Sequence, residues 1–216
     1  MAKRSYNQYC GIAAALDLLG ERWSLLIVRN LLLGPKRFKD LLEGLPGIGT
    51  GLLSQRLKEL DAAGLITRDT LPPPAASAVY RLTADGEALR PVLYELSRWG
   101  SARLGELADD QYLDPELVAL ALEVRFDRDR ADGTADGSYE LAVDGHTFGF
   151  TITGATIDIR ATAAPAARTR LVTDARTLAA LNAGSQTLAR AVAEGALTAT
   201  GDLEVLPTLA RLFGAA

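Results

Sequence analysis

Residues 21–82 decide the fold of the first half of this chain, and they read ERWSLLIVRNLLLGPKRFKDLLEGLPGIGTGLLSQRLKELDAAGLITRDTLPPPAASAVYRL. Apolar spacing predicts a helix over 22–33, a short basic helix over 36–42 and a further helix over 50–60. Two short strands are expected at 65–68 and 79–83, with a proline-rich loop between them. Helix, turn, helix and hairpin are the order of a winged helix-turn-helix.

The helix over 50–60 has two unlike faces. Thr50 follows a glycine-rich turn and is expected to cap the helix. Helical spacing places three leucines on the inner face, Leu53, Leu57 and Leu60. The opposite face then carries Gly51, Ser54, Gln55 and Lys58. An ordinary amphipathic helix shows the same pattern, but the basic helix before it and the hairpin after it favour recognition of DNA in the major groove.

Each polar residue of this region has an expected role on DNA. Gln55 is suited to a bidentate bond with adenine, and Ser54 to a base or a phosphate. Arg56 and Lys58 are expected to contact phosphates, which position the helix without reading sequence. The full set of candidate DNA contacts is Lys36, Arg37, Lys39, Thr50, Gly51, Ser54, Gln55, Arg56, Lys58, Arg68 and Arg81.

Residues 9–104 resemble the HxlR-type family of bacterial winged-helix transcriptional regulators. The resemblance rests on Cys10 and on the runs LDLLGERWSLLI (16–27), GPKRF (34–38), LPGI (45–48), LSQRLKEL (53–60), GLI (64–66) and YRLT (80–83) before Gly86. It implies a homodimer that binds a pseudo-palindromic operator in double-stranded DNA. Two departures remove potential phosphate contacts. Gly51 stands where the family often has a basic residue, and the wing, 72–78, has none.

Length and charge indicate two domains of different character. With 216 residues, the chain is long enough for a first domain over 1–105, a linker over 106–115 and a second domain over 116–216. The net charge is −4, but residues 1–105 carry +4 and residues 106–216 carry −8. Binding a polyanion needs a positive face rather than a positive total, so the acidic balance is compatible with a DNA-binding first half.

Several classes of protein are disfavoured by the composition. The sequence has no run of eighteen apolar residues, so no membrane span is predicted, and residues 1–8 lack the apolar core of a signal peptide. A single cysteine fits a reducing cytoplasm and excludes an intrachain disulfide. One Cys and one His form no metal site of recognised spacing, and no cofactor is implied. His146, the single histidine, follows a turn and has no partner spacing of a catalytic base, so we expect no enzyme.

An apolar stripe at 89, 93, 96 and 99, extended by Leu104, follows the predicted hairpin. Pro91 fits a helix there only in its first turn or at a kink. The stripe can pack into the core of its own chain or form a dimer interface. The analogy with winged-helix relatives favours the dimer.

The second half is expected to be an α+β domain with an antiparallel sheet and helices on one face. Alternating strands flank the two-residue turn Asp144-Gly145, a strong hairpin signal. Further strands are expected at 156–161, 169–172 and 197–200. An apolar segment spans 117–126. Helices are expected at 175–181 capped by Asp174, at 186–193 and, opened by Asp202, up to residue 213.

Residues 116–216 resemble the sterol-carrier-protein type of lipid-binding domain, through VDG (143–145), DARTL (174–178), GALTATGD (195–202) and LARLF (209–213). The resemblance implies a sheet and helices around an apolar tunnel for a hydrophobic small molecule. The segment 148–150 is expected to border it. Candidate lining residues are Phe148, Phe150, Ile152, Ile157, Leu188, Val192, Leu209 and Phe213. The alternative is that these residues simply fill a core.

Two further hypotheses remain open beside a dimeric, effector-responsive DNA-binding repressor. The chain could carry a hydrophobic ligand and use its winged helix as an interaction module. Cys10 could sense oxidants, as an N-terminal cysteine does in some regulators of this family, if its thiolate is exposed and activated, with Arg4 or Arg22 supplying positive charge. The alternative for Cys10 is a buried, inert thiol.

Overall fold

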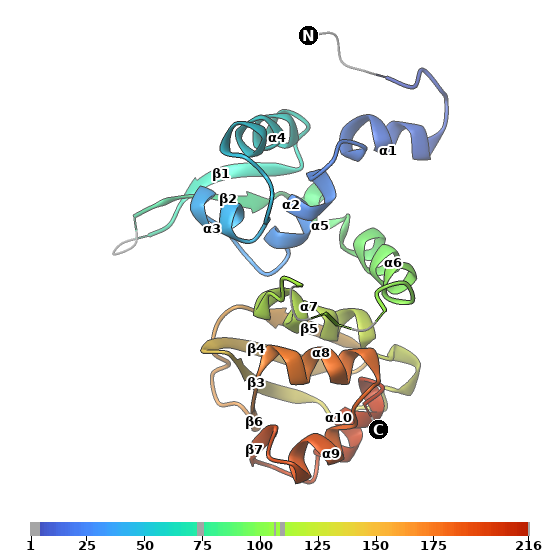
Figure 1. Cartoon of the computed structure of the whole chain (residues 1–216), viewed down its shortest axis with the longest axis vertical. Coiled ribbons are helices and arrows are strands. Elements are labelled where there is room, and N and C mark those ends of the chain that lie inside the picture. Colours follow the sequence, from blue (N-terminus) through green and yellow to red (C-terminus); the bar gives the residue numbers. More distant parts are fainter. Residues whose placement is uncertain (1–4, 73–75, 106, 109–110, 216) are drawn as a thin grey trace. The chain divides into compact units, whose positions relative to one another are not determined.

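The computed structural model describes residues 5–72, 76–105, 107–108 and 111–215. The chain divides into two compact units, Met1–Leu96 and Ser97–Ala216, each with its own sheet (Figure 1). Part of the predicted linker, at 106, 109 and 110, lies outside the described residues.

The first unit is a set of helices with a β-hairpin between α4 and α5 in the chain (Figure 1). Its elements are α1 (Gly11–Leu19), α2 (Ser24–Leu31), α3 (Phe38–Glu43), α4 (Thr50–Ala62), β1 (Ile66–Thr70), β2 (Ala78–Leu82), α5 (Ala84–Glu87) and the start of α6 (Arg90–Ser101). Helices α3 and α4 with the antiparallel hairpin β1–β2 form the winged helix-turn-helix that the sequence predicts.

The core of this unit fixes which face of α4 remains outside. Leu53, Leu57 and Leu60 are at most 2% exposed, and Ile27 of α2 and Leu41 of α3 are fully buried. Burying one such side chain stabilises the fold by roughly 1.5–3 kcal/mol. Rotation of α4 about its axis would expose all three leucines, so the opposite face is held toward solvent.

Three local features differ from the sequence prediction. Helix α2 begins at Ser24 instead of residue 22, because Trp23 has a left-handed φ of 85°. Lys36 is not helical: its backbone exchanges hydrogen bonds of 3.0 and 2.8 Å with Tyr80 of β2, so α3 begins only at residue 38. Thr50 is the first residue of α4 and not its cap, because Gly49 occupies that position without a side-chain hydrogen bond.

The second unit is a sheet covered by helices. Its elements are α7 (Pro115–Arg125), η1 (Arg128–Arg130), β3 (Gly137–Val143), β4 (His146–Thr153), β5 (Thr156–Arg160), β6 (Thr169–Thr173), α8 (Ala175–Ala183), α9 (Leu188–Ala193), β7 (Leu197–Gly201) and α10 (Leu206–Leu212). The predicted turn joins β3 to β4, and Asp144 and Gly145 have the positive φ values, 47° and 82°, that a tight hairpin requires. Asp174 caps α8 as predicted, accepting a 2.7 Å bond from the Thr177 amide.

The strands of this unit have the order β5-β4-β3-β6-β7. Neighbouring strands are antiparallel except β3 and β6, which are parallel with Leu141 opposite Leu171. The prediction of a wholly antiparallel sheet was therefore wrong at this pair. Alternation shows which face of a strand is buried, but it carries no information on direction. The connection from β5 to β6 crosses to the far side of β3 and is too long for a hairpin signal.

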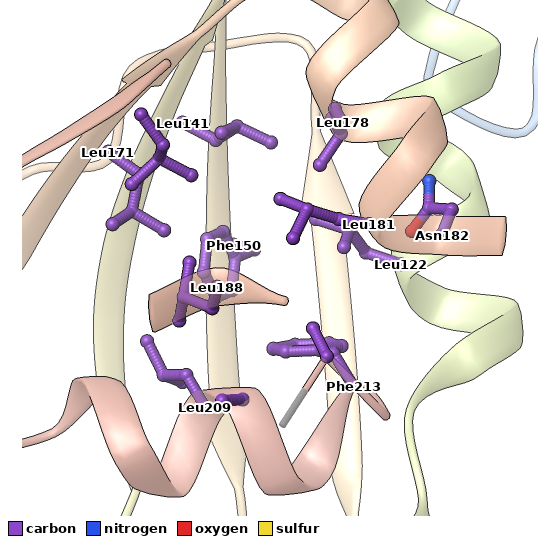
Figure 2. Close-up of a pocket in the computed structure, with 13 residues that line it drawn as sticks. Leu122, Leu141, Phe150, Leu171, Leu178, Leu181, Asn182, Leu188, Leu209 and Phe213 are labelled. Atoms are coloured by element: carbon purple, nitrogen blue, oxygen red, sulfur yellow. The ribbon is translucent and has the colours of Figure 1, made fainter. Parts of the chain in front are cut away.

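One face of the sheet is apolar and the other is polar. Tyr139 and Leu141 of β3 and Phe148 and Phe150 of β4 are at most 1% exposed, and their rings and chains share the face that the helices cover. On the opposite face, residues 140 and 170 form an ion pair of 3.0 Å. This two-sided pattern places the core of the unit between the sheet and helices α7 to α10 (Figure 2).

Candidate DNA-binding face and apolar cavity

The outer face of α4 presents polar groups to solvent. Gln55 and Lys58 are exposed and Ser54 is half-buried, while Thr50 is exposed at the start of the helix. Among the described residues, no salt bridge engages Lys58. The Gln55 amide donates a 2.9 Å bond to Glu59 one turn later. A Cβ at Gly51 would meet nothing within 4 Å, so the helix backbone there is open to close approach by a partner.

Arg56 does not belong to this outer face. Its side chain is 11% exposed and pairs with Glu21 at 2.9 Å and with Glu59. The prediction that it contacts phosphate is wrong, because its guanidinium is already engaged by two carboxylates and ties α4 to the turn before α2. Partial burial raises the pKa of Glu59, but hydrogen bonds from Gln55 and Arg56 outweigh this and hold it below the usual value.

The basic residues next to α3 differ in how accessible their side chains are. Arg37 is exposed, and its backbone amide donates a 2.9 Å bond to Asp40 at the start of the helix. Lys39 lies 3.5 Å from Glu43, with side chains 81% and 65% exposed, so this pair contributes little and opens easily. Lys36 is half-buried beside the hairpin. Arg37 and Lys39 are therefore the accessible cations of this segment.

The hairpin adds two arginines. Arg68 of β1 is exposed, and its guanidinium lies 5.6 Å from the ring centre of Tyr80, its cross-strand partner. Arg81 of β2 donates a 2.8 Å bond to Asp69, which lowers the pKa of that carboxyl. Arg81 is thus partly neutralised, whereas Arg68 keeps its charge at the surface. The wing residues 73–75 lie outside the described residues.

Exposed apolar side chains gather on two helices of the chain. On α1, Ile12 is 74% and Leu16 is 42% exposed. On α6, Leu96 and Trp99 are exposed, whereas Leu93 is buried and residue 89 is half-buried. The predicted stripe is therefore divided: its first part packs within its own unit and its second part faces solvent. Pro91 lies in the first turn of α6, where proline is tolerated.

Cys10 lies at the cap position of α1 and is exposed. Backbone amides of Ala13 and Ile12 at the helix start donate toward its sulfur and lower the pKa of the thiol. The alternative of a buried, inert cysteine is wrong for this position. Arg22 lies over the ring of Trp23 at 5.1 Å, and Arg4 is outside the described residues, so the lowered pKa rests on the helix amides.

An apolar cavity of about 50 Å³ lies between the sheet and the helices of the second unit (Figure 2). The sheet contributes Leu141, Phe150, Leu171 and Leu197, and α7 to α10 with the segment after them contribute the facing side chains. These include Leu178 and Leu181 from α8, which the sequence reasoning did not select. One polar side chain, Asn182, lies among the lining residues, and its amide donates a 3.0 Å bond to the Val118 carbonyl.

Half of the predicted lining residues reach this cavity. Phe150, Leu188, Leu209 and Phe213 line it, as expected. The others do not: Phe148 and Ile152 are buried elsewhere in the core, Ile157 is half-buried on the edge strand β5, and Val192 is exposed on the outer side of α9. Helical spacing would have found Leu178 and Leu181, since they recur on the face of α8 that points at the sheet.

Gly149 lies on the other side of the sheet, although it stands between two cavity-side phenylalanines. A Cβ at this position would come within 2.8 Å of the Thr162 carbonyl and 2.9 Å of the Ala164 amide. The expectation that this glycine borders the cavity is wrong, because successive residues of a strand point to opposite faces. A large side chain there would disturb the segment over 162–164 instead of filling the cavity.

Within the described ranges, no helix is long and apolar enough to cross a membrane. The same ranges contain no group of three or more acidic, histidine or cysteine side chains that could hold a metal ion.

A hairpin beside an exposed polar helix, held on a leucine core, defines the winged helix-turn-helix class of DNA-binding proteins. The sequence profile of the HxlR-like helix-turn-helix family matches residues 18–107. The uncharacterized HTH-type transcriptional regulator YvaP of Bacillus subtilis is 41% identical over 100 residues, which make up 46% of this chain and 89% of YvaP. The HTH-type transcriptional regulator YodB of the same organism is 38% identical over 102 residues, or 47% of this chain and 83% of YodB.

The chain therefore belongs to the HxlR-like family of helix-turn-helix transcriptional regulators. A solved structure of the reduced form of YodB has 38% identity, covers 47% of this chain and 100% of that chain, and has a TM-score of 0.39. The relatives are regulators, so the prediction that the chain is not an enzyme is confirmed. The family profile ends at residue 107, and the sterol-carrier resemblance of 116–216 stays a prediction.

Proposed function

We propose that this protein is a dimeric, sequence-specific repressor that reads its operator with α4 and responds to a hydrophobic small molecule through its second unit. The observation that carries the proposal is the orientation of α4. Three buried leucines hold one face inside, and the opposite face presents an amide, a hydroxyl and a lysine to solvent. Amide, hydroxyl and ammonium groups form hydrogen bonds with base edges and phosphate oxygens.

The roles of individual residues follow from their surroundings. Gln55 reads a base, since its amide is exposed and the competing bond to Glu59 is on the surface. Ser54 and Lys58 contact the sugar-phosphate backbone near it. Arg68, on the hairpin, adds a further contact to the sugar-phosphate backbone of the DNA. Further phosphate contacts come from Arg37 and Lys39, with smaller contributions from Lys36, Thr50, Gly51 and Arg81.

A homodimer is supported by the exposed apolar side chains of α1 and α6. Ile12 of α1 is 74% exposed and Leu96 of α6 is 47% exposed, and clusters of exposed apolar side chains on a helix mark sites of protein–protein contact. A two-fold dimer presents two copies of α4 to half-sites about one helical turn, or a multiple of it, apart. A dimer seated on an operator then blocks access to the promoter, which is the basis for proposing repression.

The second unit is proposed to bind the effector. Its sheet and helices enclose an apolar interior, as in the sterol-carrier type of domain that residues 116–216 resemble. A cavity of about 50 Å³ is well below the roughly 300–1,000 Å³ of small-molecule sites. Ligand entry therefore requires the helices to move outward.

The test of this function uses the full chain and the DNA upstream of its own gene. Fluorescence anisotropy should show saturable binding that weakens steeply with salt and that exceeds binding to random DNA of equal length by about 10³-fold or more. Equal affinity for both DNAs would contradict sequence-specific recognition. Native mass spectrometry of freshly purified protein reports the oligomeric state and any retained apolar ligand. Retained ligand without DNA binding would favour the carrier alternative.

A second candidate function rests on Cys10. Its exposure and the lowered pKa of its thiol are the properties of an oxidant-sensitive cysteine. Because the chain has a single cysteine, a disulfide would have to join two copies or a small thiol. Loss of DNA binding on treatment with diamide in the natural chain, but not in Cys10→Ser, would favour this function over ligand sensing.

A further inference from the structure

A groove separates α4 from the hairpin of the first unit, and the roles above assign some of its residues to DNA but assign it no small molecule. It has a volume of about 320 Å³ and is lined by Ser54, Leu57, Lys58, Asp61, Arg68 and Tyr80. The four α4 residues recur at helical spacing and form one stripe along the helix. Arg68 and Tyr80 stand opposite each other in the hairpin register and form the other wall.

The charges of this groove suit a single anion. Lys58 and Arg68 supply two positive charges and Asp61 one negative charge. Within the described part of the chain, no ion pair engages any of the three. The net charge of the groove is thus +1, and one carboxylate would neutralise it. The Arg68 guanidinium is already oriented by the Tyr80 ring, 5.6 Å away, so less side-chain freedom is lost when it binds a carboxylate.

The remaining surface of the groove suits a flat apolar body. Leu57 is 2% exposed and forms the floor, and Tyr80 is half-buried on the wall. Aromatic rings stack favourably against tyrosine, and a volume of about 320 Å³ falls within the usual range of small-molecule sites. An inorganic ion would leave the apolar part of the groove unused.

We infer that this groove binds a small aromatic carboxylate, with the ring against Tyr80 and Leu57 and the carboxylate between Lys58 and Arg68. Because Ser54, Lys58 and Arg68 are also proposed DNA contacts, the bound anion and DNA exclude each other. The groove is therefore an inducer site on the reading face, separate from the apolar cavity of the second unit. The exclusion of DNA rests on the proposed function, whereas binding of the anion does not.

Binding is tested without DNA, on the full chain, with benzoate as the probe. Calorimetric or NMR titration should show saturable binding of benzoate, with much weaker binding of benzamide, which has the same shape without the charge, and of acetate, which lacks the ring. Equal binding of benzamide and benzoate would overturn the charge argument. Equal binding of acetate and benzoate would overturn the ring argument.

Two variants locate the site. Asp61→Asn keeps the shape of an exposed helix residue and raises the net charge of the groove to +2. It should tighten benzoate binding about threefold at low ionic strength, the order of effect expected when one like charge near the bound carboxylate is removed in a water-like medium. Tyr80→Leu should weaken benzoate binding by removing the ring. If neither variant changes the benzoate affinity, the probe binds elsewhere and the proposal is wrong.

Competition is tested in a separate titration on operator DNA. Benzoate at ten times its own dissociation constant should raise the apparent Kd for DNA about elevenfold, as expected for mutually exclusive binding. Benzamide at the same concentration is the matched control. An unchanged Kd for DNA while benzoate occupies the groove would overturn the exclusion. A chain that binds benzoate but no DNA at all would instead count against the proposed function alone.

Discussion

Two neighbouring cations of α4, Arg56 and Lys58, should respond in opposite ways to the same substitution. Both are basic residues of the expected reading helix, yet the Arg56 side chain is 11% exposed and paired with Glu21 and Glu59, while Lys58 is exposed. Methionine keeps an apolar chain of similar length and removes the charge from either position. The matched pair Arg56→Met and Lys58→Met therefore separates a structural role from a DNA-binding role.

The cost of Arg56→Met follows from its surroundings. Removing one partner of a fully buried ion pair costs about 3–5 kcal/mol, because it leaves a buried charge alone. Here the two carboxylates are 50% and 48% exposed and can be solvated again, so most of that penalty does not apply. We expect Arg56→Met to lower the free energy of unfolding by about 1–2 kcal/mol, which corresponds to a fall of about 5–10 °C in the Tm of the first unit.

The pH dependence of this loss has a definite sign. The folded-state pKa of Glu59 is lowered, so the ionised carboxylate stabilises the folded state. This stabilisation is fully present above the unfolded-state pKa of about 4.3 and is lost as the pH falls through the folded-state pKa. The difference in stability between the natural chain and Arg56→Met should therefore be constant near neutral pH and narrow in acid. Thermal unfolding at pH 7 and at acidic pH measures it.

Lys58→Met should behave differently in both assays. Stability should change by no more than about 0.5 kcal/mol, because the side chain is exposed and its substitution disturbs no core contact. The slope of log Kd for DNA against log salt should fall by about one unit, the signature of one lost phosphate contact. If Arg56→Met instead lowers the salt slope and leaves the Tm unchanged, our assignment of Arg56 to the interior of the unit is wrong.

Three other predictions concern the remaining sites. Gln55→Ala should cost about 1–3 kcal/mol on the operator and relax base choice at one position per half-site, so equal losses on operator and random DNA would contradict a reading role. Trp99→Asp should convert the proposed homodimer into monomers in light scattering, with Arg103→Ala, which removes the cation over that ring, as a milder control; a dimer that persists would exclude this part of α6. The rate of Cys10 alkylation should rise with a pH midpoint below the usual value of about 8.5, since helix amides lower the pKa of the thiol, and a midpoint at or above it would remove the basis for redox sensing.

The reading helix was largely predictable from sequence, because helical spacing alone sorts α4 into an inner and an outer face. Leu53, Leu57 and Leu60 are buried as expected. Arg56 was not predictable in this way. Its position on the helical wheel lies at the border of the two faces, and its burial depends on Glu21, which is distant in sequence and reaches it only in the folded unit. Pairings between distant residues leave no periodic signal.

The second unit shows the same limit at the level of strands. Alternation identified the buried face of β3 and β4, and the Asp144-Gly145 turn fixed their pairing. The parallel pairing of β3 with β6 depends on a long connection whose path the residues do not encode locally. Gly149 was misassigned because a glycine between two phenylalanines looks like part of an apolar surface, whereas strand geometry turns it to the opposite face.

The small size of the apolar cavity constrains how an effector can act through it. A ligand changes DNA affinity only if it binds the free and DNA-bound forms with different free energies. A coupling of about 5–150-fold in DNA affinity requires a difference of about 1–3 kcal/mol between the two forms. A cavity of about 50 Å³ cannot admit a typical ligand without displacement of the helices that line it. That displacement is a structural change large enough to differ between the two forms.

Leu181→Phe should fill the cavity with a larger ring and cost no more than about 1–3 kcal/mol of stability. It should abolish the effector response and leave ligand-free DNA binding unchanged, because α8 belongs to the second unit. An effector response that survives in Leu181→Phe would show that the ligand acts at another site, and the groove beside α4 would then be the first place to examine.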